Sequence, residues 1–357
     1  MNRTQIYPMT QALLAAVLFG ASAPVAKFLL GRIEPIPLAA FLYLGSGVGL
    51  LLFRGVQRLG SGSASVEARI NKADIPWLAG AILAGGIAAP IVLMFSLRTT
   101  PAATASLLLN FEGVATTLIA ALVFKEAIGG RIWWAIVCIT AASILLSLDL
   151  SREWGIALGA VGVLCACALW GMDNNFTRNV SAKNPLSIVI IKGIGSGGFS
   201  LILAIVLQNP FPNFLVALGA MLLGSLSYGM SIALFIFAMR GLGAARASAL
   251  FGTAPFAGAL LSFLLFQEAP NLFMVTSLPI MIMGAVLLLG EKHAHKHVHA
   301  VVQHDHRHQH EDGHHTHDHR EAEIPASGVH CHPHTHEAIE HSHLHAPDIH
   351  HRHDHQE

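Results

Sequence analysis

The first 292 residues of this 357-residue chain contain no histidine, and charged residues make up only 12% of the whole sequence. Soluble globular domains carry about 25% charged residues, so the composition excludes an ordinary soluble protein. Without histidine, those 292 residues also lack an imidazole base or an imidazole metal ligand. No nucleophile–base pair and no ligand triad stands in their apolar runs, which argues against an enzyme.

Cysteine is equally scarce, with four residues in the chain. Cys138, Cys165 and Cys167 lie inside apolar runs, where they are interpreted as small apolar fillers. Cys165 and Cys167 are two residues apart, so on a helix they point to different faces and cannot easily chelate a metal together.

Long apolar runs are abundant, and ten of them approach the roughly 20 residues that a helix needs to cross a bilayer. The sequence therefore predicts an all-α polytopic membrane protein with ten transmembrane helices. A cleavable signal peptide is the rival interpretation of the first run, which we predict to be a permanent helix. The runs cover residues 11–30, 36–53, 75–97, 103–124, 132–150, 155–175, 187–208, 214–238, 243–266 and 272–290.

Positive charge is distributed unevenly between the predicted loops. With the N-terminus in the cytoplasm, twelve Lys and Arg residues fall on the inside and four on the outside, which fits the positive-inside rule. We therefore expect a bacterial inner-membrane protein with both termini cytoplasmic. The outside group is Lys27, Arg32, Arg98 and Arg152.

The apolar part of the chain also repeats itself. The segment "FSLRTTPAATASLLLNFEGVATTLIAALVFKE" (95–126) aligns without gaps with "FAMRGLGAARASALFGTAPFAGALLSFLLFQE" (237–268), and 12 of 32 positions are identical. A weaker match pairs "LFGASAPVAK" (18–27) with "LWGMDNNFTR" (169–178). Since each half contains five helices, an odd number, the second half must be inverted relative to the first. We predict repeats at 1–150 and 151–292, followed by a separate tail at 293–357.

Ten helices in two inverted repeats, the first-helix "FGASAPVAK" and the endings "FKE" and "FQE" resemble the EamA-type branch of the drug/metabolite transporter superfamily. The resemblance covers residues 9–290 and implies an inner-membrane transporter of small metabolites, often proton-coupled. One departure is that Gly113 stands where the family often has proline, whereas the ninth helix keeps Pro255. We therefore expect a weaker helix break in the first repeat.

Glu112 is the most distinctive candidate for a transport residue. It lies near the middle of the fourth helix, where a carboxylate costs about 2.5–3.5 kcal/mol on the insertion scale and needs a polar partner or a watery cavity. Thr116 shares its helix face, whereas Asn110 is near in sequence but off that face. A proton- or cation-binding site is predicted here; a purely structural carboxylate is the alternative.

Further polar residues extend the candidate substrate or proton pathway. In the sixth helix, Trp170, Asp173 and Asn174 form either part of a pocket or a plain cytoplasmic helix end. Tyr228 offers a hydroxyl at membrane depth in the eighth helix, beside Ser227 and Ser231, although serine can simply bond its own helix backbone. The basic residues at comparable depth are interpreted as snorkelling anchors rather than ligands; they are Lys27, Arg178 and Lys192.

All 23 histidines lie in the tail, which carries 11 acidic and 4 Lys or Arg residues. Imidazoles at alternate positions suit nickel, zinc, cobalt or copper, and the polar composition predicts disorder without metal. A solvated tail with no transport role and a pH-responsive tail are the alternatives. The candidate ligands are His293, His295, His297, His299, His304, His306, His308, His310, His314, His315, His317, His319, His330, Cys331, His332, His334 and His336.

Three functions compete. The first is secondary-active, proton-coupled export of a small metabolite or drug-like solute, with the tail as an accessory. The second is efflux of divalent metal collected by the tail, and the third is a membrane-anchored metal buffer without transport. No cofactor is required for any of these; expected partners are the solute, protons, divalent ions and the bilayer, with a homodimer left open and no nucleic acid.

Overall fold

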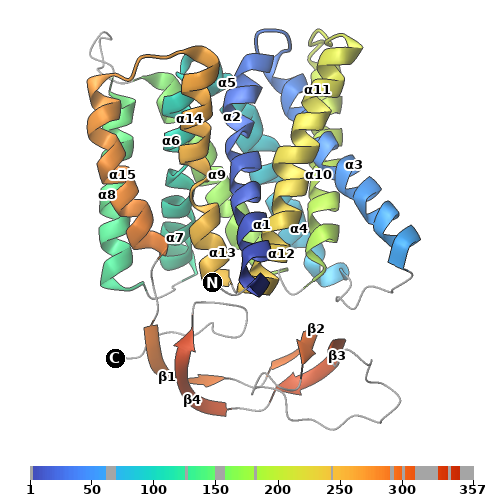
Figure 1. Cartoon of the computed structure of the whole chain (residues 1–357). Helices are drawn as coiled ribbons and strands as arrows, with labels where there is room; N and C mark the ends of the chain where they lie inside the picture. Colours follow the sequence, from blue (N-terminus) through green and yellow to red (C-terminus); the bar gives the residue numbers. More distant parts are fainter. Residues whose placement is uncertain are drawn as a thin grey trace.

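The computed structural model describes residues 3–61, 70–124, 128–148, 157–180, 183–242 and 244–289 of the membrane part, together with four short segments of the tail. The membrane part is a bundle of long, nearly parallel and antiparallel helices (Figure 1). Because the spans alternate in direction, α1 begins and α15 ends at the same side of the bundle.

The first repeat contains five spans, three of which are built from more than one helical segment. The segments are α1 (Arg3–Gly20) with α2 (Ser22–Leu29); α3 (Pro35–Ser61); η1 (Lys72–Asp74), α4 (Ile75–Ala81), η2 (Ile82–Ala88) and α5 (Ala89–Thr99); α6 (Ala102–Leu108) with α7 (Phe111–Val123); and α8 (Gly130–Ser147).

The second repeat also contains five spans, two of which are built from more than one helical segment. Its segments are α9 (Leu158–Arg178); α10 (Pro185–Val206); α11 (Phe214–Gly224), η3 (Ser225–Met230) and α12 (Ser231–Leu242); α13 (Ala244–Phe251) with α14 (Ala254–Phe266); and α15 (Leu272–Leu289). Each of the ten predicted apolar runs is therefore helical over most of the residues that the structure describes.

By length and composition, seven of these helices qualify as membrane spans among the described residues, and 254–266 and 272–287 are shorter apolar helices. The sixth span, α9, has 21 residues but ends in the polar stretch Asp173–Asn175, which lowers its mean hydropathy. It nevertheless packs against α5 and α7 inside the bundle. Asp173 and Asn175 of this stretch are buried in the bundle, where a transport pathway is expected, whereas Asn174 between them is exposed.

The fourth and ninth spans break at matching positions. Two residues separate α6 from α7, and two separate α13 from α14. The expectation of a weaker break in the first repeat is therefore wrong. The amide of Asn110 donates to the carbonyl of Leu107 at 3.1 Å and competes with the helical hydrogen bonds there, so the break forms without proline.

Close helix crossings depend on glycine. A Cβ on Gly20 would overlap the carbonyl of Ala254, and one on Gly193 would lie 2.6 Å from the backbone of Gly47. These contacts bring α1 against α14 and α10 against α3, pairs that join the two repeats. Small residues at helix contacts, as read from the sequence, let the backbones approach in this way.

The described parts of the tail form two separate antiparallel ladders, β1 (His293–His299) with β4 (Ile339–His345) and β2 (Val302–Gln309) with β3 (Val329–His336). The disorder expected of the tail without metal stays a prediction. The alternation of histidine with other residues has the two-residue period of a strand, which explains why such a sequence is compatible with a ladder.

Candidate functional site

Glu112 lies at the start of a half-helix inside the bundle. The fourth span is interrupted after Leu108, and α7 begins at Phe111, so Glu112 occupies the first turn of α7. A helix N-terminus favours negative charge, and discontinuous helices of this kind line the central sites of transporters. The thiol of Cys167 on α9 faces the carbonyl of Leu108 at the break, 3.6 Å away.

The carboxylate of Glu112 is tied to the sixth span by a neutral partner. The amide nitrogen of Asn174 donates to Oε1 of Glu112 at 2.9 Å and to the hydroxyl of Thr116 at 3.0 Å. That hydroxyl donates in turn to the backbone carbonyl of Glu112 at 2.8 Å. Three residues predicted from the sequence therefore meet, while Asn110 bonds its own helix instead.

Asp173, one residue before Asn174, belongs to a different cluster. Its carboxylate accepts hydrogen bonds from the ammonium of Lys192 at 2.6 and 2.8 Å, and from the hydroxyl of Thr177 at 2.9 Å. The Lys192 and Asp173 side chains are 17% and 8% exposed. The interpretation of Lys192 as a snorkelling anchor is therefore wrong: its charge is directed into the bundle towards a carboxylate.

An aromatic group adjoins the two acidic clusters. The hydroxyl of Tyr43 and the indole nitrogen of Trp170 both donate to the carbonyl of Gly85, at 2.7 and 2.9 Å. The rings of Tyr43 and Tyr228 stack with centroids 5.8 Å apart, and Phe19 meets Tyr228 edge-on at 5.9 Å. Trp170 and Tyr228 were predicted from the sequence, whereas Tyr43 was missed because it stands alone in an apolar run.

Ser231 in the eighth span follows the alternative in which a serine bonds its own helix backbone, whereas Ser225 donates to the carbonyl of Gly45 on α3 at 2.7 Å. The hydroxyl of Ser231 donates to the carbonyl of Ser227 on its own helix. Cys165 is exposed and Cys167 is buried, which places the two on different faces of α9. Among the described residues, no group of three or more His, Cys, Asp or Glu is arranged to hold a metal. His310 and the cluster at 314–319 lie outside the described residues.

The turn between the third and fourth spans is clamped by two charged residues. The ammonium of Lys27 donates to the carbonyls of Leu97 and Thr100 at the end of α5. The carboxylate of Glu268 accepts from the backbone N–H groups of Ala102 and Ala103 at 3.0 and 3.1 Å, which caps α6. The interpretation of Lys27 as a lipid-facing anchor is thus incomplete, because it holds this turn.

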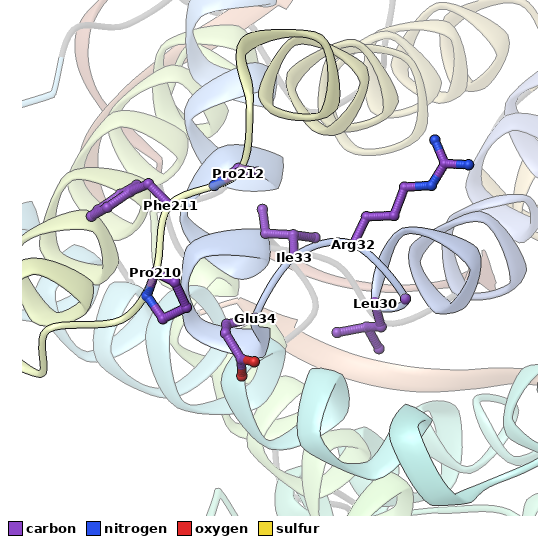
Figure 2. A pocket seen from close by; sticks show the side chains of 8 residues that line it. Leu30, Arg32, Ile33, Glu34, Pro210, Phe211 and Pro212 are labelled. Carbon is purple, nitrogen blue, oxygen red and sulfur yellow. The ribbon is translucent and has the colours of Figure 1, made fainter.

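A surface cavity of about 220 Å³ opens between the α2–α3 and α10–α11 loops (Figure 2). Its polar members include Arg32 and Glu34. The carboxylate of Glu34 is bound by Arg98 at 2.6 Å, and both side chains are about 40% exposed. The cavity thus lies at one end of the bundle, among loop residues, and contains none of the predicted pathway residues.

Comparisons with known proteins agree with this architecture. The profile of the EamA-like transporter family matches residues 7–148 and 157–290. An "Uncharacterized transporter" from Methanothermobacter thermautotrophicus is 28% identical over 296 residues, which is 77% of this chain and 83% of that protein. A solved crystal structure that is 18% identical superposes with a TM-score of 0.56 over 78% of this chain and 95% of its own. That likeness concerns the fold alone.

Proposed function

Because the chain belongs to the EamA-like transporter family, we propose that it exports a small organic solute by secondary-active transport, with Glu112 as the proton-binding group. The chain is a multi-pass membrane protein and a membrane transporter of the drug/metabolite type. The solute, the direction and the proton coupling are the parts that the proposal adds.

The observation that supports Glu112 is the contrast with Asp173. Asp173 is neutralised by Lys192 at 2.6 Å, whereas the hydrogen bond that the described residues give to the carboxylate of Glu112 comes from the neutral amide of Asn174. A carboxylate without a counter-ion inside a bundle can take up a proton or a cationic group and release it again. An ion-paired carboxylate is less available for that exchange.

The half-helix provides the second part of the mechanism. In its charged form, Glu112 is favoured by the N-terminus of α7 and by the hydrogen bond from Asn174. In its protonated form it gives up most of that stabilisation, so α7 and α9 are held together less strongly. We propose that this difference couples proton binding to the relative movement of the two inverted repeats.

We propose a bacterial inner-membrane location with both termini in the cytoplasm. Twelve of sixteen sorted basic residues fall on that side. Cysteines placed at residues 60 and 330 should then be labelled by a membrane-impermeant maleimide from the same side. Labelling from opposite sides would contradict this topology.

For the tail we propose an accessory role as a binder of nickel, zinc, cobalt or copper. Imidazoles at alternate positions among carboxylates provide suitable ligands. Metal cargo and metal buffering are distinguished by growth in excess metal. Cargo transport predicts that resistance needs both the tail and Glu112, whereas buffering predicts that resistance survives Glu112→Gln. Under our proposal neither Glu112→Gln nor a chain stopped after Lys292 changes metal tolerance.

The decisive test of organic export compares extracellular metabolites from cells that make wild type, Glu112→Gln or Glu34→Gln. Glu34 is a matched control because it is a carboxylate in a loop, paired with Arg98. At least one solute should accumulate outside wild-type and Glu34→Gln cells and stay inside Glu112→Gln cells. Export that is equal in all three, at equal protein levels, would contradict the role of Glu112.

A further inference from the structure

Two π-helical segments occupy equivalent positions in the two repeats. In the third span, the N–H of Ala89 bonds the carbonyl of Ala84, five residues back. In the eighth span, the N–H of Ser231 bonds the carbonyl of Leu226. These residues correspond under the alignment that matches residue 95 with residue 237. A π segment leaves a backbone carbonyl without its usual donor.

In the third span that carbonyl belongs to Gly85. In a regular α-helix it would accept from Ala89, which here bonds Ala84 instead. The next N–H along the chain would come from residue 90, but this is Pro90, which has no N–H. The carbonyl is satisfied from other spans, by the hydroxyl of Tyr43 and the indole of Trp170.

In the eighth span, the carbonyl at the equivalent position is bonded from within the same helix. The carbonyl equivalent to that of Gly85 belongs to Ser227, and the hydroxyl of Ser231 on the same helix donates to it. The residue equivalent to Pro90 is Ile232, which has an N–H. As far as the described residues show, the carbonyl of Gly85 therefore takes its donors from other helices, whereas that of Ser227 takes one from its own helix.

The structure also offers a hydrogen-bond partner for the third span in a different register, that is, with the α-helical in place of the π-helical hydrogen-bond pattern. If the segment became regular α-helix, Ala89 would bond Gly85 again, and Pro90 would leave the carbonyl of Gly86 without a donor. The hydroxyl of Ser196 on α10 packs against Gly86 and would overlap any Cβ there. Ser196 is fully buried, and its hydroxyl has no hydrogen-bond partner among the described residues.

We propose that the third span switches between these two registers. Tyr43 and Trp170 hold the π register by binding the carbonyl of Gly85, and Ser196 holds the α register by binding the carbonyl of Gly86. Because Pro90 has no N–H, the carbonyl of Gly85 lacks a helical donor in the π register and the carbonyl of Gly86 lacks one in the α register. In each register, side chains of other spans supply the missing hydrogen bond. The switch moves one end of the span by about 1.5 Å, the rise of one residue.

Tyr43 is a positioning residue in this switch. Its hydroxyl holds Gly85 in the first π segment, while its ring stacks on Tyr228, which lies in the second. Release of Gly85 therefore changes the contact between the repeats. The inference rests on the transport activity of the family but not on Glu112 or on proton coupling.

The chain has only three tyrosines, which makes 3-fluorotyrosine a direct probe. Full-length protein is placed in nanodiscs of phosphatidylethanolamine and phosphatidylglycerol, with Tyr7→Phe and Tyr228→Phe used to assign the fluorine signals. We expect the Tyr43 signal to show two environments, bonded and free. Ser196→Ala should shift the ratio towards the bonded environment by roughly three- to tenfold, and Pro90→Ala should shift it towards the free one.

Ser200→Ala is the matched control. Ser200 is a buried serine one turn further along α10 that also has no hydrogen-bond partner among the described residues, but it is not a neighbour of Gly86. It should leave the Tyr43 signal unchanged. An unchanged signal in Ser196→Ala, or the same shift in both serine variants, overturns the proposal. Because no transport is measured, this outcome is separate from any failure of the function assigned to Glu112.

Discussion

The ammonium of Lys192 on α10 lies 2.6 Å from the carboxylate of Asp173 on α9, and both side chains are shielded from solvent. The ion pair joins consecutive spans of the second repeat and borders the third span, because a Cβ on Gly85 would overlap the Asp173 carboxylate. The pair neutralises the carboxylate of Asp173, whereas Glu112 is the carboxylate that we propose for proton exchange.

Removal of Lys192 should be strongly destabilising because it leaves a buried carboxylate unpaired. We expect Lys192→Met to lower the free energy of unfolding by about 3 kcal/mol. The double variant Lys192→Met/Asp173→Asn should recover most of that loss. Thermal unfolding in detergent, monitored by circular dichroism, measures both. Equal destabilisation in the single and double variants would show that the pair is not the source of the effect.

Gly85 should tolerate no side chain. A Cβ there meets the carboxylate of Asp173, so Gly85→Ala forces the ion pair or the third span to move, at about 1–3 kcal/mol. Gly219 on α11 is the control because a Cβ there meets nothing within 4 Å. Gly219→Ala should be neutral or slightly stabilising. Unfolding midpoints of the two variants that fall together would contradict this packing.

Glu268 should stabilise the start of α6 through both oxygens. Glu268→Ala leaves the N–H groups of Ala102 and Ala103 without acceptors, and we expect a loss of about 1 kcal/mol. Glu268→Gln keeps one acceptor oxygen and should lose less. Hydrogen exchange of the amides at the start of α6 measures the effect directly. Faster exchange in Glu268→Ala than in Glu268→Gln is expected, and unchanged exchange in both would exclude the cap.

The tail should bind divalent metal only while its histidines are neutral. With all 23 protonated, the charge of residues 293–357 moves from −7 to +16, and protonated imidazole is not a ligand. Nickel binding measured by calorimetry should therefore be strong at pH 7.5 and lost by about pH 5. The chain stopped after Lys292 is the control. Equal nickel binding by both chains would show that the metal site lies outside the tail.

The sequence predicts the ten spans and the two repeats because bilayer thickness and apolar runs impose a length that is easily recognised. It also predicts that Glu112 and Thr116 share a face, since this follows from helical periodicity. The partners from other spans could not be derived in this way. Tyr43 and Lys192 reach Gly85 and Asp173 through the packing of separate helices, and no local pattern in either helix encodes that contact.

The break before Glu112 illustrates a different reason for a wrong prediction. A proline in the middle of the fourth span would be the expected cause of a break, and the Gly113 found there predicts a weaker one. The structure uses the amide of Asn110 on the carbonyl of Leu107 and the thiol of Cys167 on that of Leu108. The side chains that bond carbonyls at the break therefore come from two spans, and that of Cys167 belongs to α9.

Proton release by purified transporter in proteoliposomes tests the central claim most directly, with the solute found by metabolite comparison and pyranine as the pH indicator. In wild type and in Glu34→Gln, addition of that solute should move protons across the membrane together with it. In Glu112→Gln the solute-dependent proton signal should be absent. A proton signal of full size in Glu112→Gln would show that another group carries the proton and would contradict the account.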